Sequence, residues 1–336
     1  MNTIHDLIII GSGPAGLAAA IYAQRAELDS IVIEKSGMSG GQVLTTYEVD
    51  NYPGLPGANG FDLGMNFRSH ADTLGAVFVE DEVQSLEKTT AAQVAGAEEE
   101  TELYQAAEIS ATDISADEAG KLVHKVVGAK GVYYARTVIL ATGATHRKLG
   151  VPGEEKLTGS GVSYCATCDG AFFKNKTTAV IGGGDVALED AIFLARMCEK
   201  VYVIHRRDEF RGAKSLQKKL MSMDNVEIIW DSVVEEIQGQ WQVSGLKLRQ
   251  VKTEEERILP VQGVFVAVGI SPNSGEFEGT VDMERGYIKA GEDGKTSEPG
   301  IFAAGDIRTK QLRQIITAAA DGANAVTSVE RYLTED

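Results

Sequence analysis

One pattern, a strand followed by a glycine turn, a helix and a second strand, occurs twice in this chain and constrains its fold most. In the first copy the apolar run 7–10 leads directly into glycines, and a helical segment follows over 17–26. In the second copy the run 178–181 leads into the turn, with a helical segment over 188–197. A dinucleotide-binding unit has this order, because its turn brings a phosphate to the helix N-terminus. The repeat therefore predicts an α/β protein with two such units.

Both copies also end alike, which predicts the domain organisation. The strand expected over 134–140 runs into Ala141-Thr142-Gly143, and the strand over 263–267 runs into Val268-Gly269. A long closing helix is expected over 312–332. We predict two Rossmann-like three-layer dinucleotide-binding domains, the second inserted in the first: residues 1–148 with 276–336, and residues 149–275. An insertion through two short links is a natural hinge.

The first glycine turn has the features of a phosphate-binding turn. Gly11 permits the tight turn, Gly13 lets a pyrophosphate approach the backbone, and Gly16 lets the helix pack on the strand. Glu34 follows Gly11 by 23 positions, a spacing typical of a carboxylate that binds ribose hydroxyls. The residues predicted to bind this nucleotide are Gly11, Ser12, Gly13, Pro14, Ala15, Gly16, Glu34 and Lys35.

The second turn carries the opposite charge at the equivalent position. His205 follows Gly182 by 23 positions and opens the run His205-Arg206-Arg207, with Arg211 four residues further on. Guanidinium groups bind a ribose 2′-phosphate, which a carboxylate would repel. We therefore predict a 2′-hydroxyl nucleotide such as FAD at the first turn and NADPH at the second; the alternative is a solvated basic helix start. The predicted second site is Gly182, Gly183, Gly184, Asp185, Val186, Ala187, His205, Arg206, Arg207 and Arg211.

Cys165 and Cys168 form a CxxC pair just before the second glycine turn. Zinc would need further nitrogen or sulfur ligands, and a purely structural disulfide is unusual in a cytoplasmic protein. A redox-active dithiol–disulfide couple is favoured, since CxxC geometry lowers one thiol pKa. Asp169 could supply the proton that exchange requires, or be a turn residue before glycine. Cys198, within an apolar helix, is expected to be a buried and inert thiol.

Composition excludes several classes of function. A net charge of −17 disfavours nucleic acids and anionic membranes, which need a basic face. The N-terminal apolar run has only four residues and no basic segment before it, unlike a signal peptide. No stretch is apolar enough to cross a bilayer. We therefore expect a soluble cytoplasmic protein without a metal site.

The chain resembles the low-molecular-weight bacterial thioredoxin reductases over nearly its whole length. The matching blocks are Gly11–Gly16, Gly40-Gly41-Gln42, Asn51-Tyr52-Pro53-Gly54, Ala141-Thr142-Gly143, Cys165–Gly170, Gly182–Ala187, His205-Arg206-Arg207 with Arg211, and Gly305-Asp306 with Arg313-Gln314. The resemblance implies further FAD contacts at Gly40, Gly41, Gln42, Val43, Asn51, Thr142, Gly143, Asp306, Arg313, Gln314 and Ile315.

The resemblance also implies roles that the residues alone do not give. Cys168 would face the flavin, Cys165 would exchange with the protein substrate, and Asp169 would act as general acid. It further implies a homodimer that reduces thioredoxin, and an inserted domain that swings to present either the nicotinamide or the cysteine pair. Segment 89–120 departs from the family, being longer and more acidic, and is expected to be a surface loop or partly disordered.

Other functions remain open at this point. The same mechanism could serve another small redox protein, such as a glutaredoxin-like or peroxiredoxin-linked acceptor. A ferredoxin donor is disfavoured, because the second glycine turn and its basic cluster are intact. A flavin reductase would not need the cysteine pair, and a nucleotide- or redox-sensing binding protein could lose Asp169 or one cysteine. Neither loss has occurred here.

Overall fold

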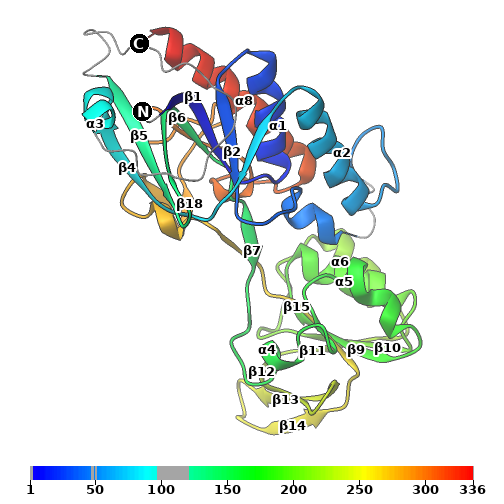
Figure 1. Cartoon of the computed structure of the whole chain (residues 1–336). Helices are drawn as coiled ribbons and strands as arrows, with labels where there is room; N and C mark the ends of the chain where they lie inside the picture. The colour runs from blue at the N-terminus through cyan, green and yellow to red at the C-terminus, as the bar shows by residue number, and fades with distance from the viewer. Residues whose placement is uncertain (1–2, 47–48, 50, 97–120, 336) are drawn as a thin grey trace. The chain divides into compact units, whose positions relative to one another are not determined.

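The structure is a computed structural model that describes residues 3–46, 49, 51–96 and 121–335. The chain divides into two compact units. Unit 1 comprises Met1–Leu44, Val49–Ala144 and Pro272–Asp336, and unit 2 comprises Thr45–Glu48 and Thr145–Ser271. Helices and strands alternate through most of the described chain, which confirms the predicted α/β class (Figure 1).

Unit 1 is built on a mixed sheet with the order β3-β2-β1-β6-β5-β4, and β19 pairs with β6. Its strands are β1 (Ile4–Ile10), β2 (Ser30–Glu34), β3 (Val77–Glu80), β4 (Val83–Thr90), β5 (Leu122–Gly128), β6 (Val132–Leu140) and β19 (Ile301–Ala303). The β1, β2, β3, β6 and β19 pairings are parallel, whereas β4, β5 and β6 pair antiparallel. The parallel strands near the centre carry long apolar runs because both faces are buried.

Helices α1 (Pro14–Arg25), α2 (Gly60–Thr73) and α8 (Ile315–Glu335) pack on one face of this sheet (Figure 1). Alternation along β1 sends Leu7 and Ile9 to this helical face and Ile8 and Ile10 to the other. The opposite face packs against the short elements η3 (Gly275–Phe277), β17 (Met283–Glu284), β18 (Tyr287–Ile288) and η4 (Gly305–Ile307). The two strands that the first copy of the repeat predicts are therefore present as β1 and β2.

Two expectations for unit 1 need correction. The closing helix, expected within 312–332 with a start near Arg313-Gln314, spans Ile315–Glu335, and residues 312–314 form part of the loop before it. Segment 89–120 is not a loop at its start: β4 continues to Thr90 and α3 (Ala91–Gly96) follows. Ala91 and Val94 are buried against β5 and β6, which gives this short helix an apolar face. The acidic residues 98–118 lie outside the described residues.

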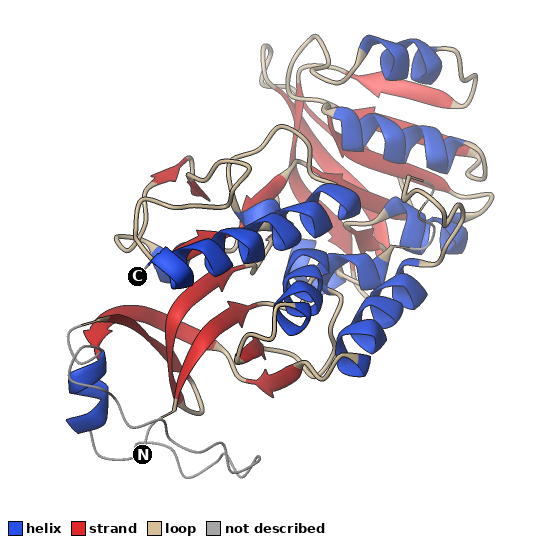
Figure 2. Cartoon of the chain, turned by 90° about the horizontal axis from the view of Figure 1, so that it is seen from above, coloured by secondary structure: helices blue, strands red, loops and turns tan. Residues whose placement is uncertain are grey.

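Unit 2 contains a parallel sheet with the order β11-β10-β9-β15-β8. Its strands are β8 (Val162–Ser163), β9 (Thr177–Gly182), β10 (Lys200–Ile204), β11 (Val226–Ile229) and β15 (Gly263–Ala267). Helices α6 (Asp185–Ala195) and α7 (Lys214–Met221) cover one face of it. The antiparallel strands β12 (Ser232–Gly239), β13 (Val243–Gln250) and β14 (Glu256–Leu259) cover the other. Figure 2 shows helices packed along the strands of each sheet.

The connections between the units are short extended segments. β7 (Ala144–His146) leaves unit 1 and β16 (Ile270–Pro272) returns to it, and the two pair as a small sheet. The remaining elements of unit 2 are α4 (Glu154–Leu157), α5 (Ala166–Asp169) and η2 (Gly170–Phe173), and η1 (Gly41–Thr45) follows β2. No helix in the described part of the chain is long and apolar enough to cross a membrane.

Candidate functional site

The first glycine turn is an open backbone cradle between β1 and α1. Gly11 has a φ of +102°, and a Cβ there would lie 2.6 Å from the Ala141 carbonyl oxygen. A Cβ on Gly16 would lie 1.8 Å from the Gly11 carbonyl oxygen, whereas one on Gly13 would meet nothing within 4 Å. Steric crowding thus requires glycine at both ends of the turn, while the space above Gly13 is open. The N–H groups at the start of α1 face this space, which suits a phosphate.

Glu34 ends β2 beside this turn and holds it in place. Its Oε2 accepts hydrogen bonds from the Ser12 amide at 2.8 Å and from the Ser12 hydroxyl at 2.7 Å. Its Oε1 accepts a hydrogen bond from the Ser36 amide at 3.1 Å. Ser12 is fully buried, so its hydrogen bonds to Glu34 fix the turn from the protein interior. The spacing of Gly11 and Glu34 did not predict this contact. Lys35, by contrast, is exposed next to Glu34.

The segment after β2 folds back over the same turn. The Gly40 amide donates a hydrogen bond to the Ser12 carbonyl at 2.8 Å. A Cβ on Gly41 would lie 3.2 Å from the Gly13 Cα, so the two backbones nearly touch. The Gln42 amide group donates to the Ala144 carbonyl, and Val43 is buried. The predicted segment 40–43 therefore forms one wall of the cradle.

Distant predicted residues also meet in unit 1. The Asn51 side-chain amide donates to the Gln314 side-chain carbonyl at 2.7 Å, across 263 residues of sequence. Ile315 packs on the small apolar cluster that contains Val43. The Arg313 guanidinium lies 4.2 Å from the centre of the Tyr287 ring. Tertiary structure thus joins the segments around 43, 51 and 314, which the sequence could only associate by resemblance.

The closing turn after β6 is held by a residue that the sequence analysis missed. Asn273 donates from its side chain to the Thr142 carbonyl at 2.8 Å and from its amide to the Gly143 carbonyl at 3.0 Å. Its own carbonyl accepts the Thr142 hydroxyl at 2.5 Å. Gly143 has a φ of +68° and open space where a Cβ would stand. No sequence signal marks Asn273, since its partners lie about 130 residues away.

Asp306 lies in unit 1 and has a buried carboxylate oxygen that is unsatisfied. Its Oδ1 is buried and has no hydrogen-bond partner among the described residues. Burial raises the pKa of Asp306, opposed by the charges of Lys310 and Arg313. A Cβ on the preceding Gly305 would lie 2.9 Å from the Ala15 Cβ, so Asp306 lies beside the first glycine turn. An orphaned acceptor next to an open cradle fits a ligand that carries both hydroxyl groups and a pyrophosphate.

The second glycine turn repeats this construction in unit 2. A Cβ on Gly182 would lie 2.3 Å from the Ala267 carbonyl oxygen, and one on Gly184 would meet nothing within 4 Å. The Gly183 carbonyl accepts the Arg211 amide at 2.8 Å, and the Asp185 carboxylate accepts the Ala213 amide at 2.6 Å. These bonds attach the basic loop to the turn. At the start of α6, Ala187 is buried and Val186 is exposed.

The basic cluster separates into one buried and three exposed side chains. His205 is 6% exposed and lies under Gly183, whose added Cβ would fall 2.3 Å from the imidazole ring. The ring packs near Phe210, and burial lowers the pKa of His205, with the neighbouring arginines adding to the effect. Arg206, Arg207 and Arg211 are exposed. The structure therefore leaves the three guanidinium groups, rather than the imidazole, to meet an anion.

The cysteine pair lies at α5, between β8 and β9 in unit 2. The Ser163 hydroxyl accepts the Cys165 amide at 3.0 Å, and the Cys165 carbonyl accepts the Asp169 amide at 3.2 Å. The side chain of Cys168 lies outside the described residues. Cys198 is a buried free thiol as predicted, and burial raises its pKa. Within the described residues, no group of three or more His, Cys, Asp or Glu side chains could hold a metal ion.

Two open glycine turns in separate units, with a CxxC segment in one of them, suggest a two-nucleotide redox protein. The family profile described as pyridine nucleotide-disulphide oxidoreductase matches residues 5–322. The chain belongs to this family. Its members use a flavin and a nicotinamide cofactor, so the chain is a flavoprotein oxidoreductase.

Relatives within the family narrow the assignment. The thioredoxin reductase of Listeria monocytogenes is 43% identical over 99% of this chain and 95% of its own length. That of Bacillus subtilis is 40% identical over 99% of this chain and 96% of its own. The crystal structure of Lactococcus lactis thioredoxin reductase has a TM-score of 0.80 at 35% identity and covers 99% of this chain and 100% of its own. The chain therefore belongs to the thioredoxin reductases, as the sequence motifs predicted.

Proposed function

We propose that this chain is an NADPH-dependent thioredoxin reductase, passing two electrons from NADPH through FAD to the Cys165–Cys168 disulfide and on to thioredoxin. The observation that carries the proposal is the reversal of charge between two otherwise similar open turns. Glu34 ends the second strand of the first unit, whereas Arg206 and Arg207 follow that of the second. A carboxylate suits ribose hydroxyls, and guanidinium groups suit a 2′-phosphate.

FAD is proposed for the turn in unit 1. The open backbone at Gly13 would receive its pyrophosphate, and the unsatisfied Asp306 Oδ1 would accept a hydroxyl of its ribityl chain. Glu34 would bind ribose through Oε1, replacing the Ser36 hydroxyl contact of 3.3 Å. The hydrogen-bonded pair of Asn51 and Gln314 would border the flavin. Bound FAD would supply the two-electron chemistry that links a hydride donor to a disulfide.

NADPH is proposed for the turn in unit 2. Gly184 leaves room for its pyrophosphate at the start of α6, and Arg206, Arg207 and Arg211 would hold its 2′-phosphate. His205 would support the loop from below, because it is buried under Gly183 and its pKa is lowered. Charge-assisted, bidentate contacts of this kind favour NADPH over NADH.

The cysteine pair is proposed to carry the electrons to the acceptor. Once the pair is reduced, the Cys165 thiolate attacks the thioredoxin disulfide and expels one thioredoxin thiolate, which takes a proton from Asp169. The Cys168 thiolate then attacks the Cys165 sulfur, which re-forms the disulfide and expels the second thioredoxin thiolate; this sulfur takes a proton from solvent, so thioredoxin leaves as a dithiol. Each cycle consumes one NADPH and one proton and yields NADP⁺ and reduced thioredoxin.

One experiment tests donor and acceptor together. Initial rates are measured with NADPH or NADH and a panel of thioredoxin-fold acceptors, which includes glutaredoxin-like and peroxiredoxin-linked proteins. Replacement of Cys165 or Cys168 by serine should abolish thioredoxin reduction and leave flavin binding intact. Cys198→Ser is the matched control, since this residue is a buried free thiol outside the CxxC pair. Thioredoxin reduction that persists in the Cys165 or Cys168 variants would refute the mechanism.

A second set of variants tests the donor. Replacing Arg206 and Arg207 together by glutamine should raise KM for NADPH far more than for NADH. An equal effect on both coenzymes would contradict the assignment of the 2′-phosphate. The control is Lys148→Gln, which removes an exposed cation of the same unit that pairs with Glu155.

We also propose the assembly and the location of the enzyme. Residues 1–148 and 276–336 would form the FAD-binding domain, and residues 149–275 the NADPH-binding domain. The enzyme would be a cytoplasmic homodimer, with a solution mass near twice the 35.9 kDa of one chain. Light scattering coupled to size-exclusion chromatography measures this mass, and a monomer value would contradict the dimer.

A further inference from the structure

A buried carboxylate in α8 holds two cations of the loop that precedes this helix. Asp321 is 5% exposed. Its Oδ1 accepts the Arg308 Nη2 at 2.6 Å, and its Oδ2 accepts the Arg308 Nε at 2.8 Å. The Lys310 ammonium lies 2.7 Å from the same Oδ2, and both cationic side chains are almost fully buried. One carboxylate therefore compensates two buried positive charges.

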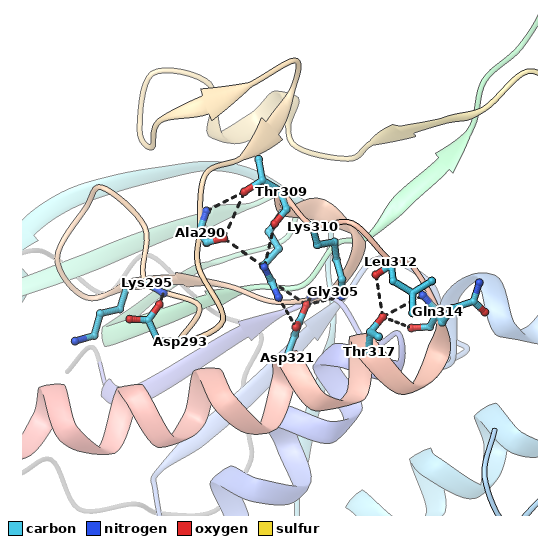
Figure 3. Close-up of polar contacts among 11 residues, drawn as sticks. Ala290, Asp293, Lys295, Gly305, Thr309, Lys310, Leu312, Gln314, Thr317 and Asp321 are labelled. Atoms are coloured by element: carbon cyan, nitrogen blue, oxygen red, sulfur yellow. Dashed lines mark hydrogen bonds and ion pairs between the residues drawn. The ribbon is translucent and has the colours of Figure 1, made fainter. Parts of the chain in front are cut away.

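The same face of α8 anchors both ends of the loop 305–314 (Figure 3). At one end, Asp321 Oδ2 accepts the Gly305 amide at 2.9 Å. At the other, the Thr317 hydroxyl accepts the Gln314 amide at 3.1 Å and donates to the Leu312 carbonyl at 3.1 Å. Thr317 and Asp321 are four residues apart, so they lie on one side of the helix. The loop between them contains Asp306.

One oxygen of Asp306, the buried Oδ1, has no hydrogen-bond partner among the described residues, although Lys310 lies near enough to act on the charge of Asp306. Arg313 acts on this charge as well. Lys310 is instead directed to Asp321. A buried carboxylate oxygen would ordinarily take such a cation, because an unsatisfied buried acceptor is costly. The Lys310 ammonium therefore pairs with Asp321 and not with Asp306 Oδ1.

We propose that Asp321 is a positioning residue for the flavin: it holds Lys310 away from Asp306, so that Asp306 Oδ1 stays open to a ribityl hydroxyl. This inference rests on the proposed binding of FAD at the first glycine turn. Without Asp321, Lys310 would pair with Asp306 and occupy the acceptor. Removing Asp321 also leaves buried cations without their carboxylate, which destabilises the fold, so the test must separate that loss of stability from a loss of flavin affinity.

The test is the affinity of the apoprotein for FAD, measured by quenching of flavin fluorescence. Asp321→Asn should weaken FAD binding about tenfold or more. Lys310 would then occupy Asp306 Oδ1, and the charge-assisted hydrogen bond between this oxygen and a ribityl hydroxyl would be lost. Adding Lys310→Met to Asp321→Asn removes the competitor and should restore affinity to within about threefold of wild type. Circular dichroism and thermal unfolding, recorded in parallel, confine the comparison to folded protein.

Glu235→Gln provides a matched control. Glu235 also holds two cations, Arg249 at 2.7 Å and Lys247 at 3.2 Å, but it lies in unit 2. The Glu235→Gln variant should therefore bind FAD as tightly as wild type does.

Three outcomes separate the hypotheses. Wild-type affinity in Asp321→Asn, or a double variant as weak as the single one, would overturn the positioning role. If Asp321→Asn does not fold, the double variant alone decides: affinity within about threefold of wild type supports the role, and a tenfold loss refutes it. Failure of the wild-type apoprotein to bind FAD would instead refute the proposed function.

Discussion

Lowering the pH should destabilise the folded chain through His124, a fully buried histidine on β5. Its ring is tightly packed, since a Cβ on Gly300 would fall 2.5 Å from its Nε2. Burial is the main cause that lowers the pKa of His124 from 6.5 to about 4. The charged groups that face it are Glu298, which raises the pKa, and Lys88, which lowers it; these two form an ion pair at 2.7 Å.

The sign of the effect follows from proton binding. Below pH 6.5 the unfolded chain takes up a proton at His124 that the folded chain refuses until about pH 4, so folding becomes less favourable as pH falls through this window. The difference in pKa corresponds to a loss of about 2 kcal/mol at pH 5 and roughly 3 kcal/mol near pH 4. At neutral pH both states carry a neutral ring, and the penalty vanishes.

Differential scanning calorimetry of wild type and His124→Leu at about pH 7.5 and pH 5 measures this loss. The wild-type Tm should fall by about 4–8 °C more than that of the variant, given roughly 2 kcal/mol. His70→Leu, which removes an exposed histidine, should retain the wild-type fall. An equal fall in wild type and His124→Leu would refute the reasoning.

Three further changes test packing and buried charge. Gly322→Ala should destabilise the chain by about 2 kcal/mol or more and weaken flavin retention, because its Cβ would lie 2.1 Å from the Ala15 carbonyl of α1; unchanged thermal unfolding would contradict the close packing of α1 on α8. Tyr164→Phe should cost about 1–2 kcal/mol in urea unfolding, since the hydroxyl donates to the buried Glu154 carboxylate at 2.9 Å. Burial raises the pKa of Tyr164 to about 12, so a loss that disappears at pH 9 would argue against this bond. Asp190→Asn should stabilise the chain at pH 8 by on the order of 2 kcal/mol but not at pH 4, because burial raises the pKa of Asp190 to about 7 and ionisation above it disfavours folding; equal stability at pH 8 would contradict the burial of this carboxyl.

Local features of the sequence were sufficient to predict the two turns. Gly11 and Gly16 are required by contacts with Ala141 and with the turn's own backbone, and both follow from the strand–turn–helix order. The charge at the end of the next strand was likewise readable, since 23 residues separate each first glycine from Glu34 or His205. The burial of the basic side chains could not be predicted from the sequence: His205 is buried, whereas the arginines after it are exposed.

Residues distant in sequence account for what the sequence analysis missed. Asn273 fixes the Thr142–Gly143 turn, and Asp321 fixes the loop that carries Asp306. Neither belongs to a recognisable motif, because hydrogen bonds to backbone groups elsewhere in the fold leave no periodic pattern in the sequence. α3 was missed for a related reason: two buried apolar side chains, Ala91 and Val94, give too weak a signal beside an acidic segment.

By itself the sequence determined the α/β class, the two glycine turns, the opposite charges beside them and the CxxC pair. These features depend on local backbone sterics and on short fixed spacings, which a chain carries wherever it folds. Tertiary structure decided which segments complete the first turn: Gly41 against Gly13, Gln314 against Asn51, and Gly305 against Ala15. It also decided that Asp321 binds the buried cations Arg308 and Lys310, because these contacts depend on distances set only when α8 packs on the sheet.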